Sequence, residues 1–256
     1  LCDRLHNMRT GDAWPEQKRR DKARETMEVY APIANRLGIL NVKEELEDRS
    51  LHYLDPVGYE EISKMLSERA GEEFLAKVSG VIERRLIESG IEGATIKRRV
   101  KSIYGIYRKT IMQNKSFDEI YDIYAVRVIL DSLAECYSTL GLIHDMYHPL
   151  PNRFKDYIST PKPNGYRSLH LIVSVPIFLH NEKKSMKVEV QLRTLAMDLW
   201  ASTEHKIRYK KDNYISPADS QALLECAHSC SEIDRKMEQI YKNIQNLKKE
   251  QEKNKQ

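Results

Sequence analysis

The sequence has little cysteine, no long apolar run and no strong excess of one charge. Its four cysteines, Cys2, Cys136, Cys226 and Cys230, show no paired spacing, which favours a reducing compartment over a disulfide-bonded secreted scaffold. No apolar stretch approaches the ~20 residues that a membrane-spanning helix requires, and no secretory signal is present. We therefore expect a soluble, cytoplasmic protein without a membrane partner.

The basic residues are unevenly placed, although the net charge of +4 is too small to require nucleic acid as a partner. No acidic residue lies between Glu92 and Asp118. That interval holds several cations that could bind RNA or a nucleotide polyphosphate: Lys97, Arg98, Arg99, Lys101, Arg108, Lys109 and Lys115. Only Tyr104 and Tyr107 are interleaved with them as stacking aromatics. We therefore favour a small nucleotide and expect no direct nucleic-acid binding.

The first ninety residues have the apolar spacing of helices and carry little chemistry. The pattern predicts helices over residues 1–9, 16–37 and 42–54, and one or two more over 57–90. Because the chain begins without Met inside the first of these, we expect a piece of a longer protein. We assign 1–90 to a helical linker, 91–211 to a core, and 212–256 to a helical tail.

From Ala94 onward strands alternate with helices, which predicts an α+β core with a sheet flanked by helices. The expected strands cover 94–100, 122–130, 169–175 and 186–194, with a polar connection over 176–185. The apolar, β-branched composition of 122–130 predicts a strand buried on both faces. Ser102 stands at the N-cap of a helix over 102–112, so the basic residues before it lead into a helix N-terminus that attracts anions.

The stretch 153–170, RFKDYISTPKPNGYRSLH, has the composition of a phosphate-binding loop. Its cations, Arg153, Lys155 and Lys162, can pair with phosphate oxygens. The Pro-Asn-Gly turn at 163–165 fixes the path of the loop, and Tyr166 can stack on a base. A solvated basic loop before a strand is the alternative interpretation.

Two carboxylates are expected on separate strands. Strict alternation in 186–194 turns Val188 and Val190 toward the core and presents Glu189 on the polar face, while Asp122 lies at the mouth of another strand. The pair suggests a Mg²⁺ site serving a triphosphate, because magnesium takes one or two protein carboxylates and completes its shell with water and phosphate oxygens. Simple pairing of both carboxylates with arginines is the alternative.

Five segments, taken in order, carry a resemblance to a known family: RVKSIYGIYRK, YDIYAVRVI, RFKDYISTPKPNGYRSLH, VEVQLRT and EHKIRYK. The region from about Lys97 to Lys211 resembles the synthetase domain of the RelA/SpoT homologues, the (p)ppGpp synthetases. The front of the chain resembles the long bifunctional members, and the rear resembles the small alarmone synthetases. The resemblance implies a nucleotidyltransferase-like mixed sheet and transfer of pyrophosphate from ATP to the 3′-hydroxyl of GDP or GTP, with AMP as the other product.

The resemblance also implies roles for individual residues. Asp122 and Glu189 would hold Mg²⁺, and Glu189 would act as base toward the 3′-hydroxyl. The ATP side would comprise Arg99, Lys101, Lys109 and Arg127. Tyr166 would stack on the guanine of GDP or GTP. The other positions on the acceptor or phosphate side would be Arg153, Lys155, Lys162, Asn164, His170, Gln191 and His205.

Several alternatives remain open at this stage. Asp3 and Asn7 match the final motif of the family's Mn²⁺-dependent hydrolase, but its earlier His and His-Asp ligands are absent from the sequence, so we expect no hydrolase activity. A catalytically silent guanine-nucleotide sensor or RNA-binding module on the same fold is one alternative, and nucleotidyl transfer at the α-phosphate is another. The tail from Ser216 predicts an amphipathic helix, which either packs on the core or forms a homo-oligomer.

Overall fold

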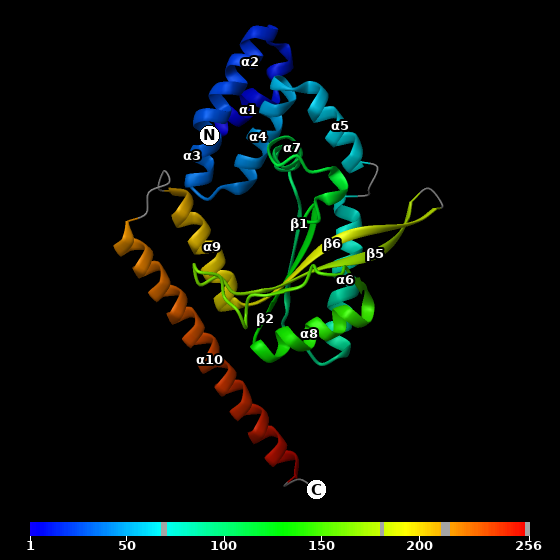
Figure 1. Cartoon of the computed structure of the whole chain (residues 1–256), viewed down its shortest axis with the longest axis vertical. Coiled ribbons are helices and arrows are strands. Elements are labelled where there is room, and N and C mark those ends of the chain that lie inside the picture. Colours follow the sequence, from blue (N-terminus) through cyan, green and yellow to red (C-terminus); the bar gives the residue numbers. More distant parts are fainter. Residues whose placement is uncertain (68–70, 180–181, 211–215, 254–256) are drawn as a thin grey trace.

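The computed structural model describes residues 1–67, 71–179, 182–210 and 216–253 of the chain. A cluster of helices at the N-terminal end adjoins a central mixed sheet, and one long C-terminal helix runs along the side of the molecule (Figure 1). This arrangement confirms the predicted α+β class. None of the described helices is long and apolar enough to cross a membrane.

The N-terminal region is helical, as predicted. Met8, Leu46 and Tyr53 anchor a small core of its own. The predicted helix over 16–37 is continuous but contains a π-helical turn, and it ends at Arg36. The predicted stop, Gly38, follows the cap residue with a φ of 75°, which favours glycine. The elements are α1 (Cys2–Arg9), η1 (Gly11–Ala13), α2 (Glu16–Glu25), η2 (Thr26–Tyr30), α3 (Ala31–Arg36), α4 (Leu40–Leu54), α5 (Pro56–Ser67) and α6 (Gly71–Glu88).

The sheet is six-stranded, with the order β1-β2-β6-β5-β3 and β4 paired to β5. β2 and β6 run parallel, whereas β1–β2 and β5–β6 are antiparallel, so the sheet is mixed. The strands are β1 (Thr95–Val100), β2 (Tyr124–Leu130), β3 (His148–Pro149), β4 (Lys155–Asp156), β5 (Leu169–Leu179) and β6 (Glu182–Thr194).

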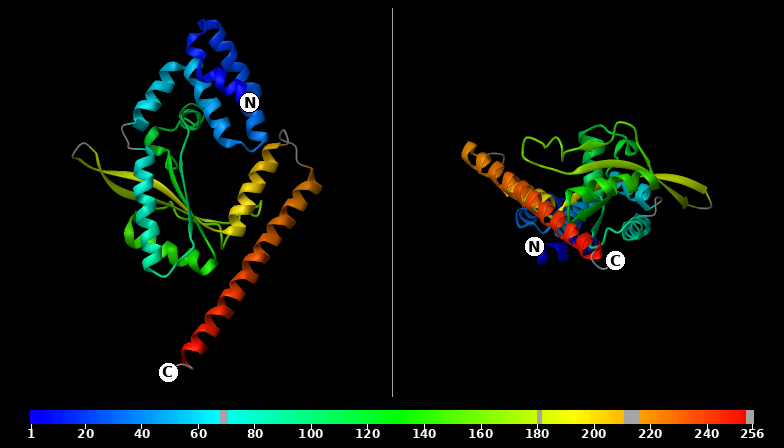
Figure 2. Two further views of the ribbon diagram at one scale, coloured as in Figure 1. Left: turned by 180° about the vertical axis from the view of Figure 1, so that it is seen from behind. Right: turned by 90° about the horizontal axis from the view of Figure 1, so that it is seen from below.

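The remaining helices flank this sheet. They are α7 (Ile103–Met112), η3 (Phe117–Glu119), α8 (Leu133–Met146), α9 (Leu195–Lys210) and α10 (Pro217–Lys253). The Ser102 side chain accepts a hydrogen bond from the backbone of Gly105, which confirms the predicted N-cap of α7. The two views of Figure 2 show α10 lying alongside α9 and extending past the sheet.

The core explains why one face of the sheet is left for chemistry. Val126, Val188 and Val190 are fully buried and belong to one cluster with Ile82 of α6 and Ile143 of α8. Alternate residues of the same strands must then point to the opposite face. The polar side chains of β1, β2, β5 and β6 therefore gather on the face that α6 and α8 leave uncovered.

Two predictions about the strands are wrong. The predicted polar connection over 176–185 is strand in its described part, because β5 continues to Leu179 and β6 begins at Glu182. The predicted strand over 122–130 begins only at Tyr124, and its residues Ala125 and Arg127 are half-buried. Ala125 and Arg127 lie on the polar face of the sheet rather than on its core face, which is why an arginine is tolerated within an apolar run.

Candidate active site

The strand register places five predicted or basic residues in one row across the polar face. Lys97 pairs with Arg127, Arg127 with Gln191, Gln191 with His170, and His170 with Lys155. These residues come from five different strands and from segments far apart in the chain. Glu189 precedes Gln191 by two residues and so lies on the same face, in the next row.

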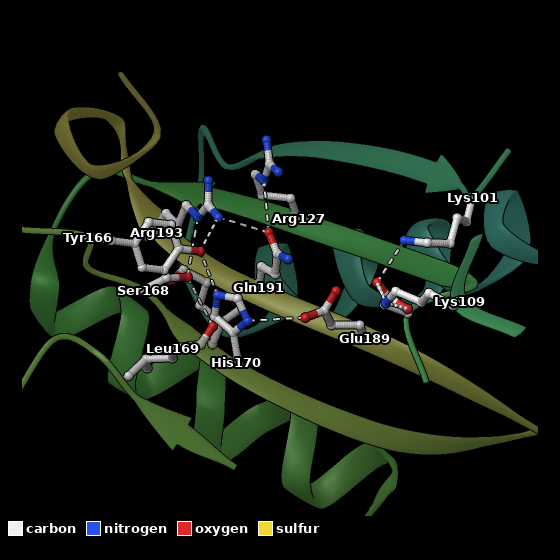
Figure 3. A network of polar contacts seen from close by, with 12 residues as sticks. Lys101, Lys109, Arg127, Tyr166, Ser168, Leu169, His170, Glu189, Gln191 and Arg193 are labelled. Atoms are coloured by element: carbon white, nitrogen blue, oxygen red, sulfur yellow. Dashed lines mark hydrogen bonds and ion pairs between the residues drawn. The ribbon is translucent and has the colours of Figure 1, made fainter. Parts of the chain in front are cut away.

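Asp122 lies in the turn before β2, and two lysines hold its carboxylate. Lys101 Nζ donates to Asp122 Oδ2 at 2.8 Å, and Lys109 Nζ lies 2.8 Å from both carboxylate oxygens. Figure 3 shows the two lysine side chains converging on the same point. Burial raises the pKa of Asp122, but the hydrogen bonds and charges of the two lysines outweigh it and lower that pKa to about 2. The carboxylate is therefore ionised at neutral pH.

Glu189 ends a chain of hydrogen bonds that starts at Arg193 (Figure 3). Arg193 Nη2 donates to the hydroxyl of Tyr166, Tyr166 Oη lies 2.6 Å from His170 Nε2, and His170 Nδ1 lies 3.1 Å from Glu189 Oε1. Burial raises the pKa of Glu189, but the hydrogen bond and charge of His170 reverse this effect and leave the pKa below its usual value. An ionised Glu189 requires the proton of His170 to sit on Nδ1.

A closed ring of four polar side chains lies beside this chain. Gln191 Oε1 accepts from Arg127 Nε at 3.2 Å and from Arg193 Nη2 at 3.0 Å. Asp198 Oδ1 accepts from Arg127 Nη1 at 3.1 Å and from Arg193 Nη1 at 3.3 Å. Gln191, predicted on the acceptor side, thus lies between the two arginines.

A cavity of about 210 Å³ opens between the two predicted metal carboxylates. Asp122 and Glu189 both line it, and the negative charge of Asp122 acts to raise the pKa of Glu189. The cavity is also lined by four of the other predicted residues, Lys109, Arg153, Lys155 and His170. Within the described residues no group of three or more His, Cys, Asp or Glu could hold a metal. Two carboxylates on one cavity still fit Mg²⁺, which needs only one or two from the protein.

The predicted anion site at the N-terminus of α7 is filled by the protein itself. Asp48 of α4 accepts from the backbone N–H of Tyr104 at 2.7 Å and of Ile103 at 3.2 Å. Arg99, predicted on the ATP side, is also engaged by α4, because its Nη2 donates to Glu44 Oε1 at 2.9 Å. Carboxylates of the linker are therefore already paired with two positive groups next to the site, the N-terminus of α7 and the Arg99 guanidinium.

Of the remaining loop residues, Lys162 and Asn164 do not line the cavity, whereas Arg153 does. Lys162 Nζ is 4.9 Å from the centre of the Tyr166 ring, a cation–π geometry. Asn164 donates to Glu204 of α9 at 3.0 Å. The Arg153 guanidinium lies 4.4 Å from the centre of the Tyr121 ring. The side chain of His205 lies outside the described part of the chain.

Sequence reasoning missed Asp198 and gave no role to Arg193. Asp198 is only 5% exposed, and Arg193 only 4%. The available signal was an acidic residue within the apolar stretch LAMDLWA, since a buried carboxylate requires partners. Those partners, Lys97, Arg127 and Arg193, come from three strands, and no local pattern identifies them.

Comparisons with known proteins identify related chains. A sequence profile described as "Region found in RelA / SpoT proteins" matches residues 98–214, and one described as "HD domain" matches residues 1–40. The bifunctional (p)ppGpp synthase/hydrolase RelA of Mycobacterium tuberculosis is 42% identical over 240 residues, which are 91% of this chain and 30% of that protein. The chain spans 23 to 30% of the length of the curated relatives it matches.

Two solved structures from Bacillus subtilis share the fold. The small alarmone synthetase 2 is 36% identical with a TM-score of 0.61, covering 71% of this chain and 97% of that one. The small alarmone synthetase 1 bound to its product pppGpp is 28% identical with a TM-score of 0.56, covering 72% of this chain and 97% of that one. With 36% identity over 97% of a solved synthetase, the chain belongs to the RelA/SpoT family.

Proposed function

We propose that this chain is a (p)ppGpp synthetase, which transfers pyrophosphate from ATP to the 3′-hydroxyl of GDP or GTP and releases AMP. The observation that carries this proposal is the cavity between Asp122 and Glu189, rimmed by lysine and arginine. Transfer of this kind needs alignment and charge neutralisation rather than a covalent nucleophile. We also propose that it acts in the cytoplasm.

On the donor side, we assign the ATP phosphates to Lys101, Lys109 and Arg127. Both lysines contact Asp122 in this structure, so they are already positioned at the carboxylate where the phosphates would arrive. Mg²⁺ held by Asp122 and Glu189 would neutralise charge on the phosphate oxygens. Arg99 can join the donor side only after its ion pair with Glu44 is broken.

On the acceptor side, Tyr166 would stack on guanine, with Lys155, Lys162, Asn164 and Arg153 around the bound nucleotide. Glu189 would accept the hydrogen bond of the 3′-hydroxyl. Because His170 keeps the pKa of Glu189 below its usual value, Glu189 contributes more by orienting the hydroxyl than by strong basicity. His170 can reach a phosphate only by leaving Glu189 or Tyr166, so we assign it first to holding Glu189.

The test is product analysis after incubating the chain with ATP, GDP or GTP, and Mg²⁺. We expect AMP together with a guanosine product that has gained two phosphates, and we expect neither when a chelator removes the metal. A guanosine product carrying adenylate would instead show nucleotidyl transfer. Binding of both nucleotides without any product would favour the sensor, in which the two lysines remain on Asp122.

Two narrower proposals accompany the activity. We expect no hydrolysis of (p)ppGpp, because Asp3 is the one metal-binding carboxylate of the hydrolase motifs that this sequence contains. Its carboxylate accepts a hydrogen bond from Asn7 at 3.0 Å.

We also propose a homo-oligomer through α10, on which Ile233, Met237 and Ile240 are 51%, 42% and 51% exposed at helical spacing. Light scattering of the chain and of a Met237→Glu, Ile240→Glu variant tests this; equal masses would instead favour simple packing of α10 on the core.

A further inference from the structure

Asp198 accepts hydrogen bonds from three basic side chains near the site, although it does not line the cavity. Its Oδ2 accepts from Lys97 Nζ at 2.9 Å, and its Oδ1 accepts from Arg127 Nη1 and Arg193 Nη1 at 3.1 and 3.3 Å. The side chain is only 7% exposed. It stands in the first turn of α9, where the helix dipole favours a negative charge.

The carboxylate compensates two like charges that the strand register forces together. Arg127 of β2 and Arg193 of β6 both donate to Gln191 Oε1, so their guanidinium groups share one neutral acceptor as well as one carboxylate. Burial and the positive charge of Arg193 lower the pKa of Arg127, while the charge of Asp198 acts in the opposite direction. Without Asp198, the two guanidinium groups would be left facing each other with only an amide oxygen between them.

The two arginines belong to the subsites of different nucleotides. Arg127 is one of the residues that we assign to the phosphates of ATP. Arg193 donates to the hydroxyl of Tyr166, and its guanidinium carbon lies 5.0 Å from the centre of that ring, so it fixes the aromatic side chain that we assign to guanine. One buried carboxylate therefore sets the position of one group from each nucleotide subsite.

We infer that Asp198 is a positioning residue that serves the donor and acceptor subsites together, by holding Arg127 in one and Arg193, and through it Tyr166, in the other. This inference rests on the proposed function for the identity of the two nucleotides. Asp198 itself touches neither nucleotide. Its loss is expected to weaken the binding of both, whereas loss of a residue within one subsite weakens one.

The central variant is Asp198→Asn, which keeps the size of the side chain and removes its charge. Dissociation constants for GDP and for a non-hydrolysable ATP analogue are measured by calorimetry, and both KM values are measured by turnover. We expect each constant to rise by roughly tenfold, the scale of one displaced charge-assisted hydrogen bond. Glu47→Gln is the matched control, because Glu47 is also buried, at 8% exposed, and is paired with Lys43 but lies on α4, away from the cavity. It should leave both constants unchanged.

A double variant separates positioning from a general loss of structure. Tyr166→Phe removes the hydroxyl through which Arg193 acts. In that background we expect Asp198→Asn to change GDP binding by less than about twofold while the ATP analogue still weakens roughly tenfold. If Asp198→Asn does not fold, Asp198→Glu keeps the charge but displaces the carboxylate, and should raise both constants to a smaller extent.

The outcomes are distinct from those of the proposed function. Unchanged constants with only a lower melting temperature, or a change confined to one nucleotide, would overturn the inference. An unmodified chain that binds both nucleotides but makes no product would overturn the synthetase proposal. In that case the two dissociation constants would still decide the role of Asp198.

Discussion

The sharpest physical prediction concerns Asp48, the carboxylate that caps α7 from the neighbouring α4. Burial is the main cause that raises the pKa of Asp48 from 3.8 to about 6. Between those two values the folded protein binds more protons at this site than the unfolded chain does. The free energy of unfolding should therefore fall as the pH rises from about 4 to about 6, by roughly 2 to 3 kcal/mol for a shift of this size.

Urea denaturation followed by circular dichroism at pH 4 to 8 measures this effect. Asp48→Asn cannot ionise, so its profile should lack the fall of roughly 2 to 3 kcal/mol. Asp122 does not mask the effect, because its pKa is lowered to about 2 and the stability it contributes is lost only as the pH falls below about 4. Glu72→Gln, an exposed carboxylate in the first turn of α6, serves as the control and should parallel the unmodified chain. Parallel profiles for Asp48→Asn and the unmodified chain would refute the buried-carboxylate account of this contact.

Three further predictions test the site. Glu189→Gln should abolish turnover and leave the dissociation constants of both nucleotides within about threefold, measured by calorimetry; full activity would remove Glu189 from the mechanism. Tyr166→Ala should weaken guanine-nucleotide binding by roughly 1 to 3 kcal/mol, the scale of one base stack, and an unchanged acceptor KM would contradict stacking. Lys109→Met should raise the KM for ATP by roughly tenfold, the scale of one charge-assisted contact, without changing that for GDP; equal rises for both nucleotides would place Lys109 outside the donor side.

The sequence was informative where a local pattern determines structure. Alternation in β6 correctly placed Glu189 on the polar face, and the Ser102 cap correctly placed the start of α7. These features depend on neighbours within a few residues or on a strict period of two.

Contacts between distant segments could not be predicted in the same way. Nothing near Asp48 or Glu44 indicates that α4 would reach the backbone of Tyr104 and the side chain of Arg99. Asp198 lies 71 residues from Arg127 in the chain. Such pairings follow from how the elements pack. From the sequence alone, the N-terminus of α7 and Arg99 were both expected to bind a ligand rather than carboxylates of α4.

The most direct test of the central claim follows the phosphates of ATP. The chain is incubated with Mg²⁺, GDP or GTP, and ATP labelled on either the γ- or the α-phosphate. The synthetase account predicts label in the guanosine product from the γ-labelled ATP alone, with the α-label recovered in AMP. Label entering the guanosine product from the α-position would contradict pyrophosphoryl transfer and make the chain a nucleotidyltransferase.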